Sequence, residues 1–301
     1  MSKVEVLGLK LPLIEGRCDI VSEILRAAKE SSVEILDHDI IVITDKILSK
    51  CFNRVAKVED VKVSKKALKL AKKSGLNPVF VELVMRNSDN VVAVVPFKKF
   101  IKEGLIDLKS LSKDFESAEK LISEYPSFFI TEREGMLWSD SGIDSSNLPA
   151  GYYSIPVEDH DLVAKMIRKE IYRVLRRRVA VVVCDTEAFL GGSMDFARGS
   201  YGIDPIDRCF ACKDLHGKPK FGGVDIIVHE ICSATALVFK QTSEAIPIAI
   251  VRGVKYRECE CGFKDSIPKI DILKIFREVI RETIRVLGFK KLLKVLKMII
   301  W

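Results

Sequence analysis

Apolar and polar residues are spaced along the chain as short strands and amphipathic helices require. Apolar runs predict strands at residues 4–9, 40–44, 91–95, 128–131, 179–184, 224–228 and 246–251. Apolar positions three and four residues apart predict helices at residues 19–31, 64–73, 78–85, 161–177 and 230–240. The charged, leucine-spaced stretch 102–124 is predicted to be an exposed helical insertion. Strands that alternate with helices predict a mixed α/β fold, and the order strand, helix, strand is typical of parallel sheets.

The predicted strand at residues 179–184 is followed directly by Asp185 and Thr186. A continuous run of β-branched residues is buried on both faces only inside a sheet. The carboxylate that follows such a strand projects into the crevice beyond the strand ends, where open α/β sheets bind ligands. Asp185 and Thr186 are therefore predicted to belong to a ligand site.

A second acidic stretch runs from Ser141 to Asn147 and contains a turn that Gly142 permits. This turn places Asp144 and Asn147 three residues apart, near enough to share one ligand. Carboxylate, hydroxyl and amide oxygens suit Mg²⁺ or Mn²⁺ carrying a phosphate. Either Asp144 or Asp185 alone also fits an ordinary turn or helix-capping role. Together, the two acidic stretches predict a divalent-cation site.

Two lysines follow the predicted strand at residues 40–44. Lys46 and Lys50 are four residues apart, so a helical segment would bring both to one face. A strand followed by a basic turn indicates anion binding.

Composition narrows the class of protein. The 301 residues, 48% of them hydrophobic, can bury a large core in one large domain or two ordinary ones. Without a signal-like leader or an uncharged apolar run of about 18 residues, we expect a cytoplasmic protein. The net charge of +7 fits an anionic substrate, a nucleotide or a lipid surface, and gives no argument for nucleic acid. Gln241 is the only glutamine, and the four histidines form no ligand pattern.

The cysteines fall partly into close pairs. In a cytoplasmic protein the eight cysteines are expected to be mostly reduced, without a disulfide framework. Cys209 and Cys212 form one close pair, and Cys259 and Cys261 form another. Four thiolates arranged in two pairs could hold a structural Zn²⁺ ion. Unpaired buried cysteines are the other interpretation.

The character of the chain changes after residue 257. We expect residues 1–257 to form the main domain and residues 258–301 to form an appendage. The appendage combines a Cys-x-Cys turn with a basic amphipathic helix predicted over residues 271–301. Such a helix fits peripheral contact with an anionic membrane surface. It also fits docking on the main domain or on a dimer partner.

Several separate segments, in the same order, resemble the γ-glutamyl ligases of coenzyme F420 biosynthesis. The similar segments are residues 11–14, 45–50, 141–147, 184–186, 213–217 and 247–253. Residues 141–147 are similar to the family's Ala-Gly-Ile-Asp-x-Ser-Asn signature, and residues 184–186 to its Thr-Asp-Thr. The resemblance covers about residues 3 to 256 and implies the family's mixed α/β fold, with two intertwined subdomains.

The resemblance implies a homodimeric, GTP-dependent ligase that joins glutamate to F420-0, or to a similar anionic cofactor precursor, through an acyl phosphate. Its catalytic domain would span residues 1–257. The implied ligands of Mg²⁺ or Mn²⁺ are Asp144, Asp185, Thr186 and Gln241. The implied nucleotide contacts are Leu11, Pro12, Leu13, Ile14, Asp45, Lys46, Lys50, Asn147, Phe239, Lys240, Thr242, Ser243 and Glu244.

The chain departs from the family after Thr186. The family continues with Gly-Arg-Pro and an aromatic-Arg pair, whereas residues 187–192 contain no arginine. Arginine binds planar anions through two parallel hydrogen bonds, so its loss is expected to change how a phosphorylated substrate is held. Arg198 could return one positive charge, whereas Asp140 adds negative charge near the implied metal.

These departures leave two alternatives open. One is a paralogue that glutamylates another acid, such as a folate or pterin. The other is a non-catalytic protein that binds a nucleotide and a metal ion, and acts through its tail or its cysteine pairs.

Overall fold

A five-stranded sheet forms the centre of the main domain in the computed structural model, which describes residues 3–189, 192–240, 242–267, 272–290 and 293–294. The strand order is β1 (Glu5–Leu9), β12 (Ile248–Arg252), β2 (Ile40–Thr44), β8 (Ala180–Phe189) and β9 (Gly192–Tyr201). Within these described strands, β2 and β8 are parallel and the other neighbouring pairs are antiparallel. The prediction of a mixed α/β fold is confirmed, whereas the parallel arrangement applies to one pair of strands.

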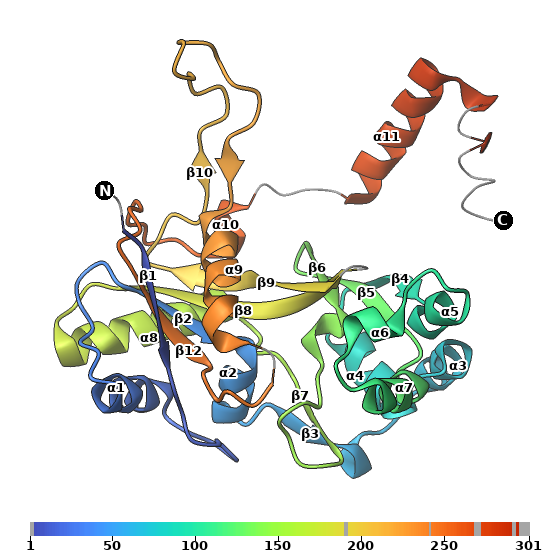
Figure 1. The fold of residues 1–301 in the computed structure, drawn as a ribbon, viewed down its shortest axis with the longest axis horizontal. Helices are drawn as coiled ribbons and strands as arrows, with labels where there is room; N and C mark the ends of the chain where they lie inside the picture. Colours follow the sequence, from blue (N-terminus) through green and yellow to red (C-terminus); the bar gives the residue numbers. More distant parts are fainter. Residues whose placement is uncertain (1–2, 190–191, 241, 268–271, 291–292, 295–301) are drawn as a thin grey trace. The chain divides into compact units, whose positions relative to one another are not determined.

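Helices cover both faces of this sheet (Figure 1). One face carries α1 (Ile20–Glu30) and α8 (His160–Leu175), and the other carries α9 (Ile227–Phe239) and α10 (Phe263–Ser266). In β2, Ile41 and Ile43 pack into the first core, while Ile40 and Val42 pack into the second. Successive side chains of a strand point to opposite faces, so a strand buried on both faces has an unbroken apolar sequence.

A smaller subdomain is formed by chain that lies between β2 and β8 in sequence, drawn in cyan and green in Figure 1. Its sheet contains β4 (Asn90–Val95), β5 (Phe128–Arg133) and β6 (Met136–Ser139). Its helices are α3 (Lys65–Ser74), α4 (Pro78–Arg86), α5 (Phe97–Lys102), α6 (Leu108–Leu111) and α7 (Phe115–Glu124). Phe80, Val84 and Phe129 pack in its core. The short strands β3 (Val55–Lys57) and β7 (Tyr152–Ser154) pair beside it.

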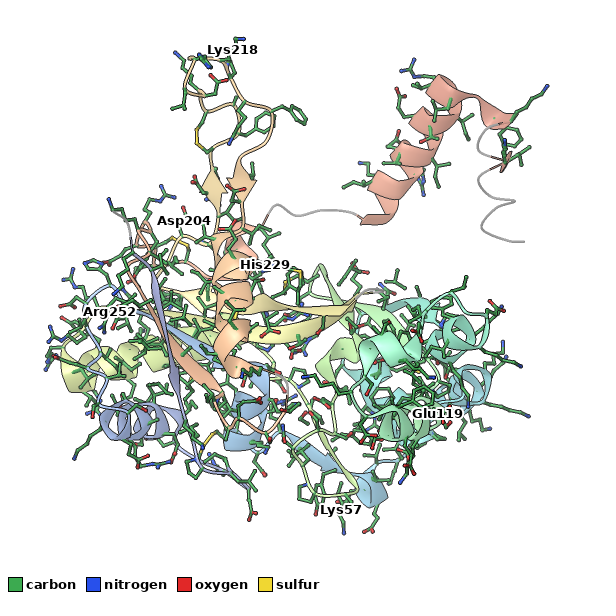
Figure 2. The ribbon with its side chains drawn as sticks, in the orientation of Figure 1. Lys57, Glu119, Asp204, Lys218, His229 and Arg252 are labelled. Carbon is green, nitrogen blue, oxygen red and sulfur yellow. A yellow bond between two sulfur atoms is a disulfide. The ribbon has the colours of Figure 1, made fainter. Side chains whose placement is uncertain are left out.

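A two-stranded hairpin extends from the sheet, with Lys218 labelled at its tip (Figure 2). It contains β10 (Asp207–Arg208) and β11 (Val224–Asp225). The prediction of a strand over residues 224–228 is wrong beyond Asp225, because α9 begins at Ile227. Val228, Ile231 and Cys232 are buried at helical spacing on one face of α9, which explains the apolar run.

Strand β9 is not predicted by the apolar pattern. Its sequence contains Asp195, Arg198 and Ser200, which are polar and yet buried. It forms an antiparallel hairpin with β8, which continues past Cys184 to Phe189. Asp185 is therefore inside a strand, not beyond its end as predicted, although the pairing of β8 with β2 stops at Cys184.

The boundary of the tail also differs from the prediction. One compact unit extends to Ile267, so the Cys-x-Cys turn belongs to the main domain and not to the appendage. Glu260 pairs with Arg168 at 2.5 Å and Phe263 is buried in the core, which anchors this turn.

The second unit begins at Pro268 and contains α11 (Ile272–Leu287). Gly288 has a φ of 79°, a left-handed conformation that ends the helix. The last part of the helix predicted over residues 271–301 lies outside the described residues. Among the helices described, none has the length and apolar character to cross a membrane.

Candidate active site

One edge of the central sheet collects the segments that the sequence marked as functional. Leu9 pairs with Ile248, Ile248 pairs with Ile43, and Ile43 pairs with Val183. This row crosses four strands, so the segments just beyond it lie at one edge. They are residues 11–14 after β1, residues 242–247 before β12, residues 45–50 after β2, and residues 185–186 of β8.

Two carboxylates lie side by side at this edge. Thr44, the last residue of β2, pairs with Cys184, so Asp45 at the start of α2 and Asp185 on β8 directly follow this pair. Burial raises the pKa of the Asp185 carboxyl to about 7, and the negative charge of Asp45 adds to this shift, although Arg198 opposes it. A carboxylate in this position gains free energy from a nearby cation.

The turn that carries Asp144 approaches β8 closely. Gly142, at the end of the short 3-10 helix η2 (Asp140–Gly142), has a φ of 72°. A Cβ atom there would lie 2.7 Å from Cγ of Pro156 and 3.2 Å from Oδ2 of Asp185. Glycine therefore permits both the left-handed backbone and the approach of the acidic turn to Asp185.

Replacing Gly142 with alanine is expected to lower the free energy of unfolding by about 2–4 kcal/mol, because strain in the left-handed region adds to steric overlap. Gly135→Ala is the matched control, since Gly135 has a φ of 75° and a Cβ atom there would meet no other atom within 4 Å. Its expected cost is about 1 kcal/mol. Urea denaturation of the variants measures the difference, and equal losses would contradict the close approach.

Helix α2 (Asp45–Cys51) connects the acidic turn to β2 through its lysines. The Nζ of Lys46 pairs with the carboxylate of Asp144 and contacts the hydroxyl of Ser146. Although burial acts in the opposite direction, the charge of Lys46 and hydrogen bonds hold the pKa of Asp144 below its usual value. The Nζ of Lys50 donates to the carbonyl oxygen of Asn147 at 2.5 Å. Asp144, Asn147 and both lysines are thus brought together.

The other predicted metal ligands differ in how they are placed. The hydroxyl of Thr186 donates to Oδ1 of Asp195 at 2.6 Å, which fixes its direction. Gln241 lies outside the described residues. In the described part of the chain, no three His, Cys, Asp or Glu side chains are gathered closely enough to hold a metal ion. The predicted site depends on a hydroxyl and an amide besides its two carboxylates.

Backbone hydrogen bonds fix the chain around the predicted nucleotide contacts at residues 11–14 and 242–244. The amide of Leu11 donates to the carbonyl of Ala245 at 2.8 Å, and that of Thr44 donates to the carbonyl of Pro247 at 2.9 Å. Leu11 is buried, whereas Pro12 and Leu13 are exposed. Glu244 accepts a hydrogen bond from the hydroxyl of Thr242.

The end of α9 is less suited to nucleotide contact. The side chain of Phe239 packs in the core, so it does not line an exposed site. Lys240 and Ser243 are exposed beyond the helix end.

His160 is a site residue that the sequence analysis missed. Its Nε2 atom lies 2.8 Å from Oδ1 of Asp45, and its side chain is 0% exposed. The sequence shows no ligand pattern among the histidines, and this contact places His160 directly against Asp45. The partners are 115 residues apart, so no local sequence pattern could reveal the contact.

A buried ion pair lies behind the carboxylates. Arg198 on β9 pairs with Glu187 on β8, and its guanidinium lies 3.7 Å from the ring centre of Trp138. Burial lowers the pKa of Arg198 to about 10, although Asp185 and Asp45 favour its charged form. The positive charge that Arg198 was expected to supply is thus close enough to Asp185 to lower the pKa of its carboxyl.

Asp140, the other departure near the acidic turn, is partly protonated near neutral pH. Burial raises the pKa of its carboxyl to about 7, and Asp144 adds to the shift. Its Oδ1 accepts a hydrogen bond of 2.8 Å from the amide of Phe129. Asp140 therefore positions the turn.

All eight cysteines are paired, contrary to the expectation of free thiols. The disulfides are Cys18–Cys51, Cys184–Cys232, Cys209–Cys212 and Cys259–Cys261. The two close pairs are each bridged internally, so the described structure does not provide the four free thiolates that the predicted Zn²⁺ site requires.

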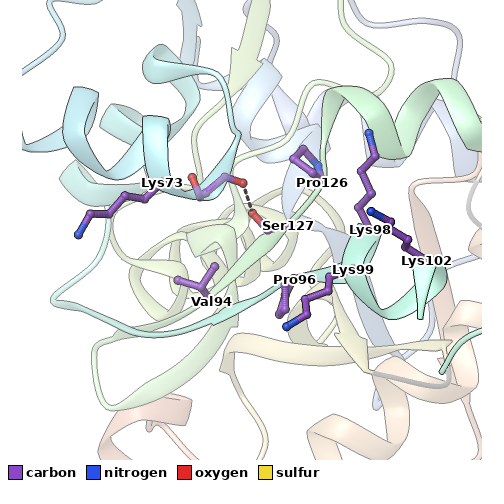
Figure 3. A pocket seen from close by; sticks show the side chains of 9 residues that line it. Lys73, Val94, Pro96, Lys98, Lys99, Lys102, Pro126 and Ser127 are labelled. Atoms are coloured by element: carbon purple, nitrogen blue, oxygen red, sulfur yellow. Dashed lines mark hydrogen bonds between the residues drawn. The ribbon is translucent and has the colours of Figure 1, made fainter. Parts of the chain in front are cut away.

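Two shallow pockets lie in or beside the smaller subdomain. Figure 3 shows a pocket of about 340 Å³ flanked by Lys73, Lys98, Lys99 and Lys102; no residue of the predicted site lines it. A second, of about 210 Å³, is lined by Ser145 and Leu148 from the acidic turn and by Tyr125, Tyr152 and Tyr153. The second pocket therefore adjoins the candidate active site.

The chain is similar to known proteins over most of its length. A protein-family model described as F420-0:Gamma-glutamyl ligase matches residues 8–253. The coenzyme F420:L-glutamate ligase of Methanocaldococcus jannaschii is 30% identical over 255 residues, which cover 83% of this chain and 88% of that protein. That of Methanothermobacter thermautotrophicus is 28% identical over 253 residues, covering 83% and 89%. That of Methanosarcina mazei is 26% identical over 285 residues, covering 94% and 96%.

Proposed function

The chain belongs to the F420-0:gamma-glutamyl ligase family, and on that premise we propose that it is a GTP- and metal-dependent ligase that joins L-glutamate to F420-0 or a similar cofactor acid. Its relatives are named as ligases, so the chain is an enzyme of the amide ligase type. Beyond this enzyme class, the proposal specifies GTP as the nucleotide, a divalent metal ion and an acyl phosphate as the intermediate.

One observation carries the proposal: acidic and basic side chains lie close together at one edge of the central sheet. Asp45 and Asp185 follow the last pair of the parallel strands β2 and β8, and Lys46, next to Asp45, pairs with Asp144. Ligands bind at such strand ends in open α/β sheets. Phosphoryl transfer requires both cationic groups for the phosphates and carboxylates for a metal ion.

The donor set fits Mg²⁺ or Mn²⁺. Asp144, Asp185, Thr186 and Gln241 would offer two carboxylates, a hydroxyl and an amide, all hard oxygen donors. Burial and the charge of Asp45 raise the pKa of Asp185 more than Arg198 and Lys46 lower it, so a further positive charge would stabilise its carboxylate. A divalent ion there would neutralise part of the phosphate charge.

In the proposed first step, an oxygen of the acceptor carboxylate forms a bond to the γ-phosphorus of GTP. The bond from that phosphorus to its bridging oxygen breaks, and GDP leaves. Lys46 and Lys50 would lie against the phosphates and offset the negative charge on them.

In the proposed second step, the amine of glutamate forms a bond to the acyl carbon. The bond from that carbon to the phosphate oxygen breaks, and phosphate leaves with the electron pair. The nitrogen loses its proton to solvent as the amide forms.

The proposal is tested by incubating the full chain with GTP, L-glutamate, F420-0 and either MgCl₂ or MnCl₂. GDP, phosphate and a glutamylated product should form together, and Lys46→Met should lower kcat/KM for GTP about a hundredfold. Lys57→Met is the control, because Lys57 lies on β3 and pairs with Glu59. Metal-dependent GTP binding without turnover would instead support the non-catalytic alternative.

One observation favours a second acceptor class. Residues 187–192, where the family resemblance implies an arginine-containing loop, contain no arginine, and the side chain of Arg198 on β9 is buried. Folate and pterin acids therefore belong in the same assay. Turnover with one of them and not with F420-0 would identify a paralogue.

A further inference from the structure

Helix α11 carries an exposed apolar face. Ile275, Val279, Ile280, Val286 and Leu287 have exposed fractions between 47% and 62%. At 3.6 residues per turn these five positions fall on one side of the helix. An apolar face of this size requires a nonpolar environment, which solvent does not provide.

The opposite side of α11 is basic. Lys274, Arg277, Arg281 and Arg285 fall on it at the same helical spacing. The two acidic residues are neutralised within the helix, because Glu278 pairs with Arg281 at 2.8 Å and Glu282 pairs with Arg285. Helix α11 therefore contains four basic residues and two acidic ones, so it carries more positive charge than its own carboxylates neutralise.

Further lysines follow the helix. Residues 271–301 contain eight Lys or Arg residues and three Asp or Glu residues, an excess of five positive charges. Lys290 and Lys294, after the helix, are exposed. Most of the net charge of +7 is therefore placed in the tail.

From these features we infer that α11 binds the surface of an anionic lipid bilayer. Its apolar face would enter the boundary between headgroups and acyl chains, and its basic side would face anionic headgroups. A second copy of the chain fits less well, because pairing two tails would bring the same excess of positive charge together. The helix lies along the surface, since it is too short and too charged to span.

Co-sedimentation of the full chain with vesicles tests this inference. The chain should sediment with vesicles of phosphatidylcholine mixed with phosphatidylglycerol and should remain in the supernatant with phosphatidylcholine alone. Raising the salt concentration should reduce the bound fraction, because ions screen the headgroup charge. Trp138 is buried, so a change of tryptophan emission on adding vesicles would report on Trp301, the other tryptophan.

Two variants separate the apolar and electrostatic contributions. Val279→Glu combined with Ile280→Glu should weaken vesicle binding at least about tenfold, because the face loses apolar area and gains charge. Lys274→Glu combined with Arg277→Glu should weaken binding to anionic vesicles by a similar factor. Leu121→Glu is the control, since Leu121 is an exposed leucine on α7 in the smaller subdomain.

The inference is overturned if the full chain does not sediment with anionic vesicles, or if neutral vesicles bind it equally well. It is also overturned if light scattering shows that the apolar-face variant changes only the oligomeric state. None of these outcomes depends on ligase activity, so the proposed function is tested separately.

Discussion

Asp185→Asn should lower kcat/KM for GTP-dependent glutamate ligation about a thousandfold and at the same time stabilise the fold. The proposed metal ion would lose one of its two carboxylate ligands. The variant also removes a buried carboxyl whose charge is opposed by that of Asp45, just beyond the last pair of β2 and β8. Such opposite effects on activity and stability are expected where a site is built from like charges.

The sign of the stability effect follows from the pKa. The Asp185 carboxyl has a pKa of about 7 in the folded chain, against an ordinary value of 3.8. The folded state therefore binds the proton more tightly, and the stability of the wild type should fall as pH rises from about 4 to about 7. Asparagine does not titrate, so the variant should lack the contribution of Asp185 to this fall, keep that of Asp140, and be more stable than the wild type by about 1–3 kcal/mol above pH 7.

Urea denaturation at several pH values, in the presence of EDTA, measures this difference. Adding MgCl₂ or MnCl₂ should then raise the melting temperature of the wild type and not that of Asp185→Asn. Asp39→Asn is a matched control at the opposite edge of the sheet, where Asp39 binds Arg252, labelled in Figure 2. It should lose stability and keep its response to metal. A wild-type stability that does not change over this pH range would refute the raised pKa.

Arg198→Met should have the largest effect on stability, a loss of about 3–5 kcal/mol. The side chain of Arg198 is 3% exposed, and that of its partner Glu187 is 10% exposed. Without Arg198, the Glu187 carboxylate would stay buried with its positive partner removed. The stacking of the guanidinium on Trp138 would be lost as well.

Combining Arg198→Met with Glu187→Gln should recover most of the loss, because the charge and its partner are removed together. Glutamine keeps an oxygen that can accept the hydrogen bond from the amide of Ser139. Arg173→Met is the surface control, since Arg173 pairs with Glu170 in water and should cost less than about 1 kcal/mol. A double variant no more stable than Arg198→Met would contradict the ion-pair explanation.

The double variant also tests whether Arg198 serves the reaction. If its charge only stabilises the fold, a stable double variant should retain kcat/KM. If its charge offsets that of Asp185 during turnover, activity should stay low and the pH profile should shift to higher pH, because Arg198 lowers the pKa of Asp185.

Local sequence was sufficient for most of the main elements. The strand predicted at residues 40–44 has the same bounds as β2. Asp19, where the first helix is predicted to begin, is the N-cap of α1. It was not sufficient for β9, because the buried residues Asp195 and Arg198 do not follow the pattern of a buried strand. It also misassigned residues 226–228, because a short apolar run is compatible with a strand or a helix.

The sequence by itself determined the strands that are apolar on both faces and marked the residues proposed for the chemistry, because burial on both faces and oxygen-donor chemistry are local properties of residue type. The tertiary structure decided which of those residues meet. It placed Asp45 beside Asp185, His160 against Asp45, and Arg198 behind both. These contacts depend on strand register and chain crossings over more than 100 residues, as in the separation of 115 residues between Asp45 and His160. Such pairings leave no periodic signal in a single sequence.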